Sequence, residues 1–165
     1  MGHQEAPMPE LKAAVIVASN RIKEGTKPNK AGQRAVELLT NHGVEVTQKQ
    51  CLNEGAANLR PALSQVIEAG TDVVLVIGAT GISRDNDTPE VTEEFIAARM
   101  WGLETQVLLE GLKNSPRAGL CRGIIGVTSC PPGNLLVNSA SSVGAVEDTL
   151  AVVLPLLKDI FRECR

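Results

Sequence analysis

Residues 72–78 read DVVLVIG, and this apolar run decides the fold. Such an unbroken stretch of Val, Leu and Ile is typical of a strand buried on both faces, as strands of parallel sheets are. A second run of this kind, LKAAVIVAS, occupies residues 11–19. Between them lie a helical pattern at 31–43, a more exposed strand at 44–52 and a helical pattern at 57–70. This order predicts a parallel sheet with right-handed crossovers.

The second half of the chain predicts further helices. Glutamates in the first turns favour a helix over residues 89–100, and a second helix follows at 104–114. The amphipathic stretch 141–164 predicts a long final helix, which Pro155 kinks. Its apolar positions would serve the core in preference to an interface.

A β-hairpin is predicted where residues 122–130 and 135–140 flank the turn PPGN. The fold class is therefore a three-layer α/β/α arrangement, with a mostly parallel sheet and one antiparallel edge hairpin. We expect a single domain over residues 11–165, preceded by a flexible N-terminal tail at residues 1–10.

The composition excludes several classes of function. The formal net charge is −3, and the chain has one Trp and no Tyr, so neither a phosphate-binding basic face nor a base-stacking platform for nucleic acid is expected. No apolar run is long enough for a membrane helix, and the start lacks the pattern of a signal peptide. The four cysteines form no C-x-x-C pair, which argues against a zinc site. We expect a cytoplasmic protein with no nucleic-acid or membrane partner.

Three loops fall where ligands bind in open α/β sheets, at the carboxyl ends of strands: residues 19–30, 78–89 and 138–142. In the second loop, the sequence GATG offers backbone N–H groups at close approach and the hydroxyl of Thr80. It predicts a phosphate cradle without a Walker lysine. A plain turn, with Thr88 capping the next helix, is the alternative. The acids that follow would repel a phosphate unless Mg²⁺ lay between, and a solvated charged loop is the other reading.

Four stretches, in order, resemble the molybdenum-cofactor-biosynthesis domain of the MoaB/Mog type, which is similar to domains of MoeA and gephyrin. They are AVIVASNR with KAG near 30–32, VVLVIGATGISRDNDTPE, SPRAGLCRGIIG and LLVNSASSVGAVEDTLAVVLPLL. The resemblance runs from about Lys12 to Phe161. It implies a three-layer fold, commonly a homotrimer, that binds molybdopterin. In catalytic members it also implies Mg²⁺ and ATP, with adenylylation of the terminal phosphate of the pterin.

The resemblance implies site residues on these loops. If the chain is an active enzyme, we expect Asp85, Asp87 and Glu54 as catalytic residues that substitute for acids of the family, and Asp85 and Asp87 would hold the metal. As ligand-binding residues the resemblance implies Ser19, Gly78, Ala79, Thr80, Gly81, Thr88, Pro89, Glu90, Asn138, Ser141 and Ser142.

The chain departs from the family pattern in these same loops. Ala79 replaces a glycine, and Asn86 and Asn53 fall where the family has aspartates. An amide accepts a hydrogen bond but carries no charge for Mg²⁺. Two hypotheses follow: an active adenylyltransferase in which neighbouring acids substitute, or a catalytically impaired paralogue that binds the pterin or a pathway partner protein. A generic nucleotide-handling domain, like that of competence-damage-inducible proteins, is the third.

Overall fold

A six-stranded sheet forms the centre of the computed structural model, which describes residues 9–130 and 133–163. Its strand order is β2-β1-β3-β6-β5-β4. The parallel part contains β1 (Lys12–Ala18), β2 (Glu45–Leu52), β3 (Val73–Ile77) and β6 (Leu135–Ser139). The antiparallel edge contains β5 (Ile125–Val127) and β4 (Ala98–Arg99). The predicted fold class, including the edge hairpin, is confirmed.

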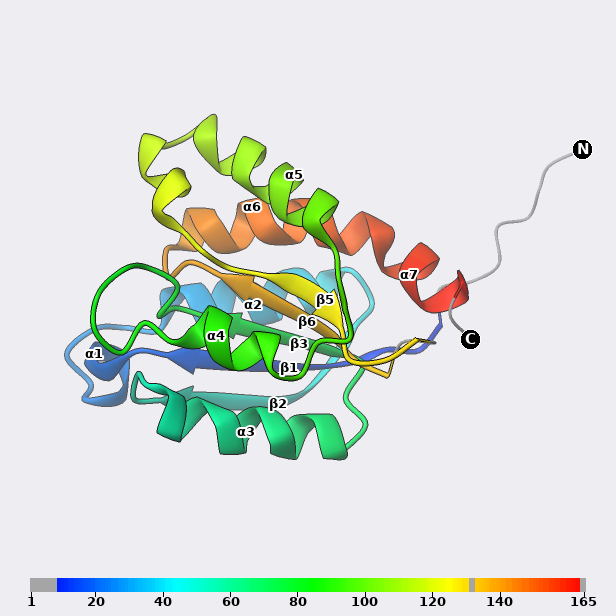
Figure 1. Ribbon diagram of the computed structural model, residues 1–165, viewed down its shortest axis with the longest axis horizontal. Helices are drawn as coiled ribbons and strands as arrows, with labels where there is room; N and C mark the ends of the chain where they lie inside the picture. Colours follow the sequence, from blue (N-terminus) through cyan, green and yellow to red (C-terminus); the bar gives the residue numbers. More distant parts are fainter. Residues whose placement is uncertain (1–8, 131–132, 164–165) are drawn as a thin grey trace, which may run out of the picture.

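Helices cover both faces of this sheet (Figure 1). One face packs against α2 (Lys30–Asn41), α5 (Trp101–Leu112), α6 (Val143–Val153) and α7 (Leu157–Glu163). The opposite face packs against α3 (Ala56–Glu68) and α4 (Thr88–Glu93). The short α1 (Asn20–Lys23) follows β1. None of the helices in the described part of the chain combines the length and apolarity needed to cross a bilayer.

The central strand β3 supplies side chains to both layers of the core. Val73, Leu75 and Ile77 face the α2–α6 layer, while Val74 and Val76 face the α3–α4 layer. Each of the five is at most 1% exposed, which explains why the strand is apolar throughout and does not alternate. The carboxyl end of β3 therefore lies in the interior of the sheet, between the ends of β1 and β6.

The predicted helix over residues 89–100 is wrong in its second half. Helix α4 ends at Glu93, and β4 then pairs with β5 through Ala97 N–H to Val127 O (2.9 Å) and Met100 N–H to Ile125 O (2.8 Å). Pairing with a distant strand therefore outweighs the local helical pattern. Residues 19–30 contain α1, so they are not wholly a loop, and the next helix begins at Trp101, ahead of the predicted residue 104.

The final helix is interrupted at Pro155, as predicted. A 3₁₀ turn over Leu154–Leu156 contains Pro155 and separates α6 from α7. The apolar positions of this helix are buried in the core of the chain: Val146, Leu150, Val153, Leu154 and Leu157. Most of the predicted N-terminal tail (residues 1–8) and the two prolines of the hairpin turn lie outside the described residues.

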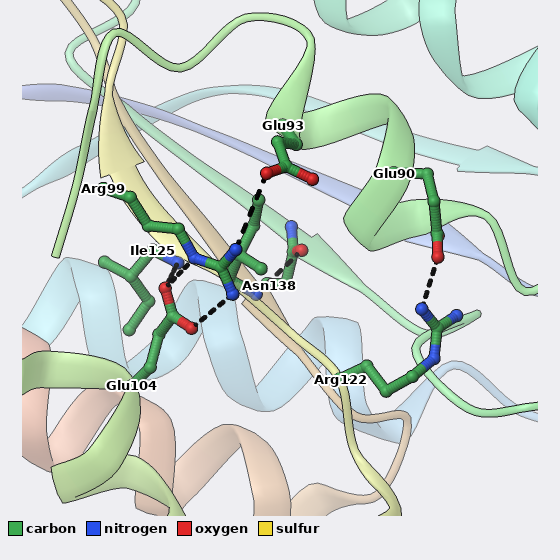
Figure 2. Close-up of polar contacts among 8 residues, drawn as sticks. Glu90, Glu93, Arg99, Glu104, Arg122, Ile125 and Asn138 are labelled. Atoms are coloured by element: carbon green, nitrogen blue, oxygen red, sulfur yellow. Dashed lines mark hydrogen bonds and ion pairs between the residues drawn. The ribbon is translucent and has the colours of Figure 1, made fainter. Parts of the chain in front are cut away.

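An ion pair holds the two-residue strand β4 at the sheet edge (Figure 2). The guanidinium of Arg99 donates to both carboxylate oxygens of Glu104 on α5, at 2.8 and 2.9 Å. Glu104 also accepts from Ile125 N–H of β5 at 3.2 Å. The Arg99 guanidinium in turn stacks on the Trp101 ring, 3.6 Å from its centroid. One carboxylate thus connects β4, α5 and β5.

We predict that Glu104→Ala lowers the free energy of unfolding by about 2 kcal/mol, because it leaves Ile125 N–H without its acceptor and Arg99 with only the longer contact to Glu93 at 3.7 Å. Glu110→Ala is the matched control on the same helix, since its pair with Lys113 is largely exposed. That control should cost less than about 0.5 kcal/mol. Urea unfolding monitored by circular dichroism measures both changes. Equal losses of unfolding free energy in the two variants would contradict a role for Glu104 in holding β4 at the sheet edge.

Candidate functional site

A cavity of about 1000 Å³ lies at the carboxyl ends of β1, β3 and β6. Loops after these strands form one side, and α5, the 3₁₀ turn Pro116–Leu120 and the start of α6 form the other. Several predicted site residues line it: Ser19, Glu54, Ala79, Thr80, Gly81, Asn138, Ser141 and Ser142. Others are not among its lining residues: Gly78, Asp85, Asp87, Thr88, Pro89 and Glu90. The structure thus brings all three predicted loops to one cavity.

The GATG loop leaves β3 through a glycine that has no room for a side chain. Gly78 has φ +96°, and a Cβ there would lie 2.5 Å from the carbonyl oxygen of Ala18. Its N–H donates to Ser139 O at 2.8 Å, which ties the loop to the end of β6. Ala79, the departure from the family glycine, has φ +54°. A side chain tolerates this left-handed conformation at a cost of about 1 kcal/mol.

Arg122 contacts both the GATG loop and α4, and it lines the cavity. Figure 2 shows its pair with Glu90. Its guanidinium donates to Gly81 O (2.9 Å) and Asn86 O (2.8 Å) and pairs with the Glu90 carboxylate. Its own backbone N–H donates to Thr80 O at 2.9 Å. The hydrogen bond from Arg122 lowers the pKa of Glu90. Sequence reasoning missed Arg122 as a site residue, although it stands in the quoted stretch SPRAGLCRGIIG.

Two side-chain contacts complete the loop. The Asn86 amide oxygen accepts from Gly81 N–H at 2.9 Å, and the Cys121 thiol donates to the Thr80 hydroxyl at 3.4 Å. Asn86, Thr80 and Cys121 all line the cavity. The loop is therefore held in one shape by groups from residues 86–90 and 121–122, before any ligand binds.

The predicted acids lie apart from one another. Glu54 lines the cavity; its carboxylate accepts from Asn20 N–H at 3.4 Å, and its backbone N–H donates to Asn20 Oδ1 at 2.9 Å. Asp87 accepts from Ala56 N–H at 3.2 Å, at the start of α3, and is not part of the lining. Asp85 is exposed, with φ +65°. Among the described residues, no three His, Cys, Asp or Glu side chains converge to hold a metal ion.

The predicted polar ligand residues differ in what they offer. Ser142 caps α6, its hydroxyl accepting from Ala145 N–H at 3.0 Å, and so places a helix N-terminus at the cavity. Ser19 caps α1 in the same way. Asn138 is 3% exposed, accepts from Ile124 N–H and donates to the Thr92 hydroxyl. Its amide is therefore engaged within the protein, whereas Ser142 presents a helix end that favours an anion.

Thr88 and Pro89 serve the fold behind the loop. Both are buried in α4, and Thr88 N–H donates to Ala79 O at 3.2 Å. Asp87, and not Thr88, stands at the cap position, without a side-chain capping bond. The alternative in which Thr88 caps the helix is thus wrong. The Thr88 hydroxyl is buried and finds no partner among the described residues.

Comparisons with known proteins agree with this geometry. The family described as "Probable molybdopterin binding domain" matches residues 14–159. The chain belongs to this family. A Corynebacterium diphtheriae protein assigned to molybdenum cofactor biosynthesis has 36% sequence identity and a TM-score of 0.87, over 94% of this chain and 98% of that one. The fold is therefore that of the MoaB/Mog molybdenum cofactor biosynthesis proteins.

Two curated relatives are longer than the matched region. Gephyrin of Dictyostelium discoideum is 24% identical over 153 residues, which cover 87% of this chain but 21% of that protein. The molybdopterin adenylyltransferase of Pyrococcus furiosus is 33% identical over 87 residues, 53% of this chain and 50% of that protein. The chain thus spans a fifth of one relative and matches half of the other.

We predict that Gly78→Ala destabilises the fold by at least about 2 kcal/mol, because the new methyl group meets the Ala18 carbonyl at a positive φ. Gly102→Ala is the control, since a Cβ there meets open space within α5. That change should raise stability by about 0.5–1 kcal/mol. Thermal unfolding of the purified variants measures both. A Gly78→Ala protein as stable as the wild type would contradict the close approach of the loop.

Proposed function

We propose that this chain binds molybdopterin in the cavity, with the terminal phosphate of the pterin against the GATG loop. One observation carries the proposal: the GATG loop and the N-terminus of α6 line the same cavity at the carboxyl ends of parallel strands. Both elements suit an anion, through backbone N–H groups and a helix end. The cavity volume of about 1000 Å³ suits a ligand of this size.

Roles within the site follow from the lining residues. The Thr80 hydroxyl and the N-terminus of α6 at Ser142 would contact the phosphate, while Ser19 and Ser141 line the walls along which the pterin would extend. Arg122 would not contact the ligand itself but would hold Gly81 and Asn86 in position. The implied homotrimer, partner proteins of the pathway and cytoplasmic location remain predictions.

Adenylyl transfer is the second candidate function, favoured by the relative named molybdopterin adenylyltransferase. In that reaction the pterin phosphate would attack the α-phosphate of ATP, and pyrophosphate would leave. Glu54 lines the cavity, but Asp85 and Asp87 would have to turn toward it to act on the phosphates. We therefore propose molybdopterin binding as the first candidate function and adenylyl transfer as the second.

We predict saturable binding of molybdopterin by isothermal titration calorimetry. Thr80→Val keeps the shape of the loop and removes one hydroxyl, so binding should weaken about tenfold or more, as expected for a lost hydrogen bond to a charged group. Thr47→Val, on the edge strand β2 and outside the cavity, is the matched control and should bind as the wild type does. Absence of saturable binding by the wild-type protein would contradict the proposal.

The same samples separate binding from catalysis. With Mg²⁺ and ATP added, pyrophosphate release that Glu54→Gln abolishes would establish adenylyl transfer at this cavity. Binding without pyrophosphate release would establish the pterin-binding paralogue.

A further inference from the structure

The donor set of the cavity does not fit a divalent cation held by the protein. Mg²⁺ is bound through oxygen ligands, normally with one or two carboxylates and the phosphates of its substrate. At the position where the family has an aspartate, the cavity has the neutral amide of Asn86, whose oxygen already accepts from Gly81 N–H at 2.9 Å. The adjacent Asp87 directs its carboxylate to Ala56 N–H on α3. Neither supplies a charge to the cavity.

The carboxylates that do line the cavity are engaged. Both oxygens of Glu104 accept from Arg99. Asp148 accepts from the Asn114 side chain at 3.3 Å, and Glu54 accepts from Asn20 N–H. These groups come from different elements, and none forms a converging cluster with other acids of the described chain.

Arg99 and Arg122 of the same cavity are ion-paired, whereas three further cationic side chains are not paired among the described residues. Arg21 and Lys27 come from the segment after β1, and Arg117 comes from the 3₁₀ turn on the opposite wall. Within residues 9–130 and 133–163, none of the three forms an ion pair. Uncompensated cations in a cavity attract an anion and can neutralise it without a metal.

We propose that Arg21, Lys27 and Arg117 neutralise the phosphate of the ligand, and that the protein holds no divalent cation at this site. This inference rests on the proposed binding of molybdopterin, and it makes that binding independent of Mg²⁺. In this proposal the uncharged side chain of Asn86 stabilises the loop by accepting from Gly81 N–H. The implied metal role of Asp85 and Asp87 is the competing hypothesis.

A titration with Mn²⁺ alone tests the metal part without any pterin. Mn²⁺ takes the same oxygen ligands as Mg²⁺, and its free concentration is read by electron paramagnetic resonance. We expect no saturable Mn²⁺ binding by the wild type and a gain of about tenfold or more in affinity for Asn86→Asp, which restores a charge at the cavity. Asn41→Asp adds the same charge at the end of α2 and should behave as the wild type does. Wild-type binding that Asp85→Ala or Asp87→Ala abolishes would overturn the inference.

Calorimetry with molybdopterin tests the cation part. We expect equal affinity in EDTA and in Mg²⁺, and a loss of about three- to tenfold for each of Arg21→Ala, Lys27→Ala and Arg117→Ala. Lys12→Ala, at the opposite end of β1, is the control and should leave the affinity unchanged. Binding that requires Mg²⁺, or that survives loss of all three cations, overturns this inference and leaves the proposed function intact. No binding in either buffer contradicts the proposed function itself, and the Mn²⁺ titration still decides the metal part.

Discussion

The site depends on the close approach of the loop after β3 to the end of β1. The end of β3 lies between β1 and β6, so its loop has to turn across the carbonyl of Ala18. Only glycine fits at position 78, because φ is positive there and a Cβ would meet that carbonyl oxygen. This turn delivers Thr80 and Gly81 to the cavity instead of to solvent. Burial of β3 on both faces fixes the starting point of the turn, so the packing of the core sets the position of the loop.

The loop is then locked by groups that are distant in sequence. Arg122 donates to the carbonyls of Gly81 and Asn86 and pairs with Glu90, and the Asn86 side chain accepts from Gly81 N–H. A preformed loop loses less conformational entropy when a ligand binds. The preformed loop also has a disadvantage for catalysis, because the polar groups that hold it together are no longer free to bind a metal or a phosphate. The cavity therefore has the features of a binding site more clearly than those of a transferase.

The sequence allows the parallel sheet and the ligand edge to be predicted, since both follow from local patterns: apolar runs buried on two faces and glycine-rich turns at strand ends. Strand β4 could not be predicted, because its two residues lie within a helical pattern and pair with distant residues of β5, Ala98 with Val127 and Arg99 with Gly126. Contacts of side chains such as Asp87 with Ala56 and Arg122 with Gly81 likewise join residues 31 and 41 positions apart. Such pairings are set by the tertiary fold, so the local sequence identifies the loop but not the direction of its acids.

The most direct measurement is a crystal structure of the protein with molybdopterin, grown in the presence of Mg²⁺. We predict the terminal phosphate at Thr80 and Gly81, approached by Arg21, Lys27 or Arg117, with Asn86 still bound to Gly81 N–H. A Mg²⁺ ion between the phosphate and Asp85, Asp87 or Glu54 would contradict the metal-free account. A pterin bound away from the GATG loop would contradict the assignment of the site.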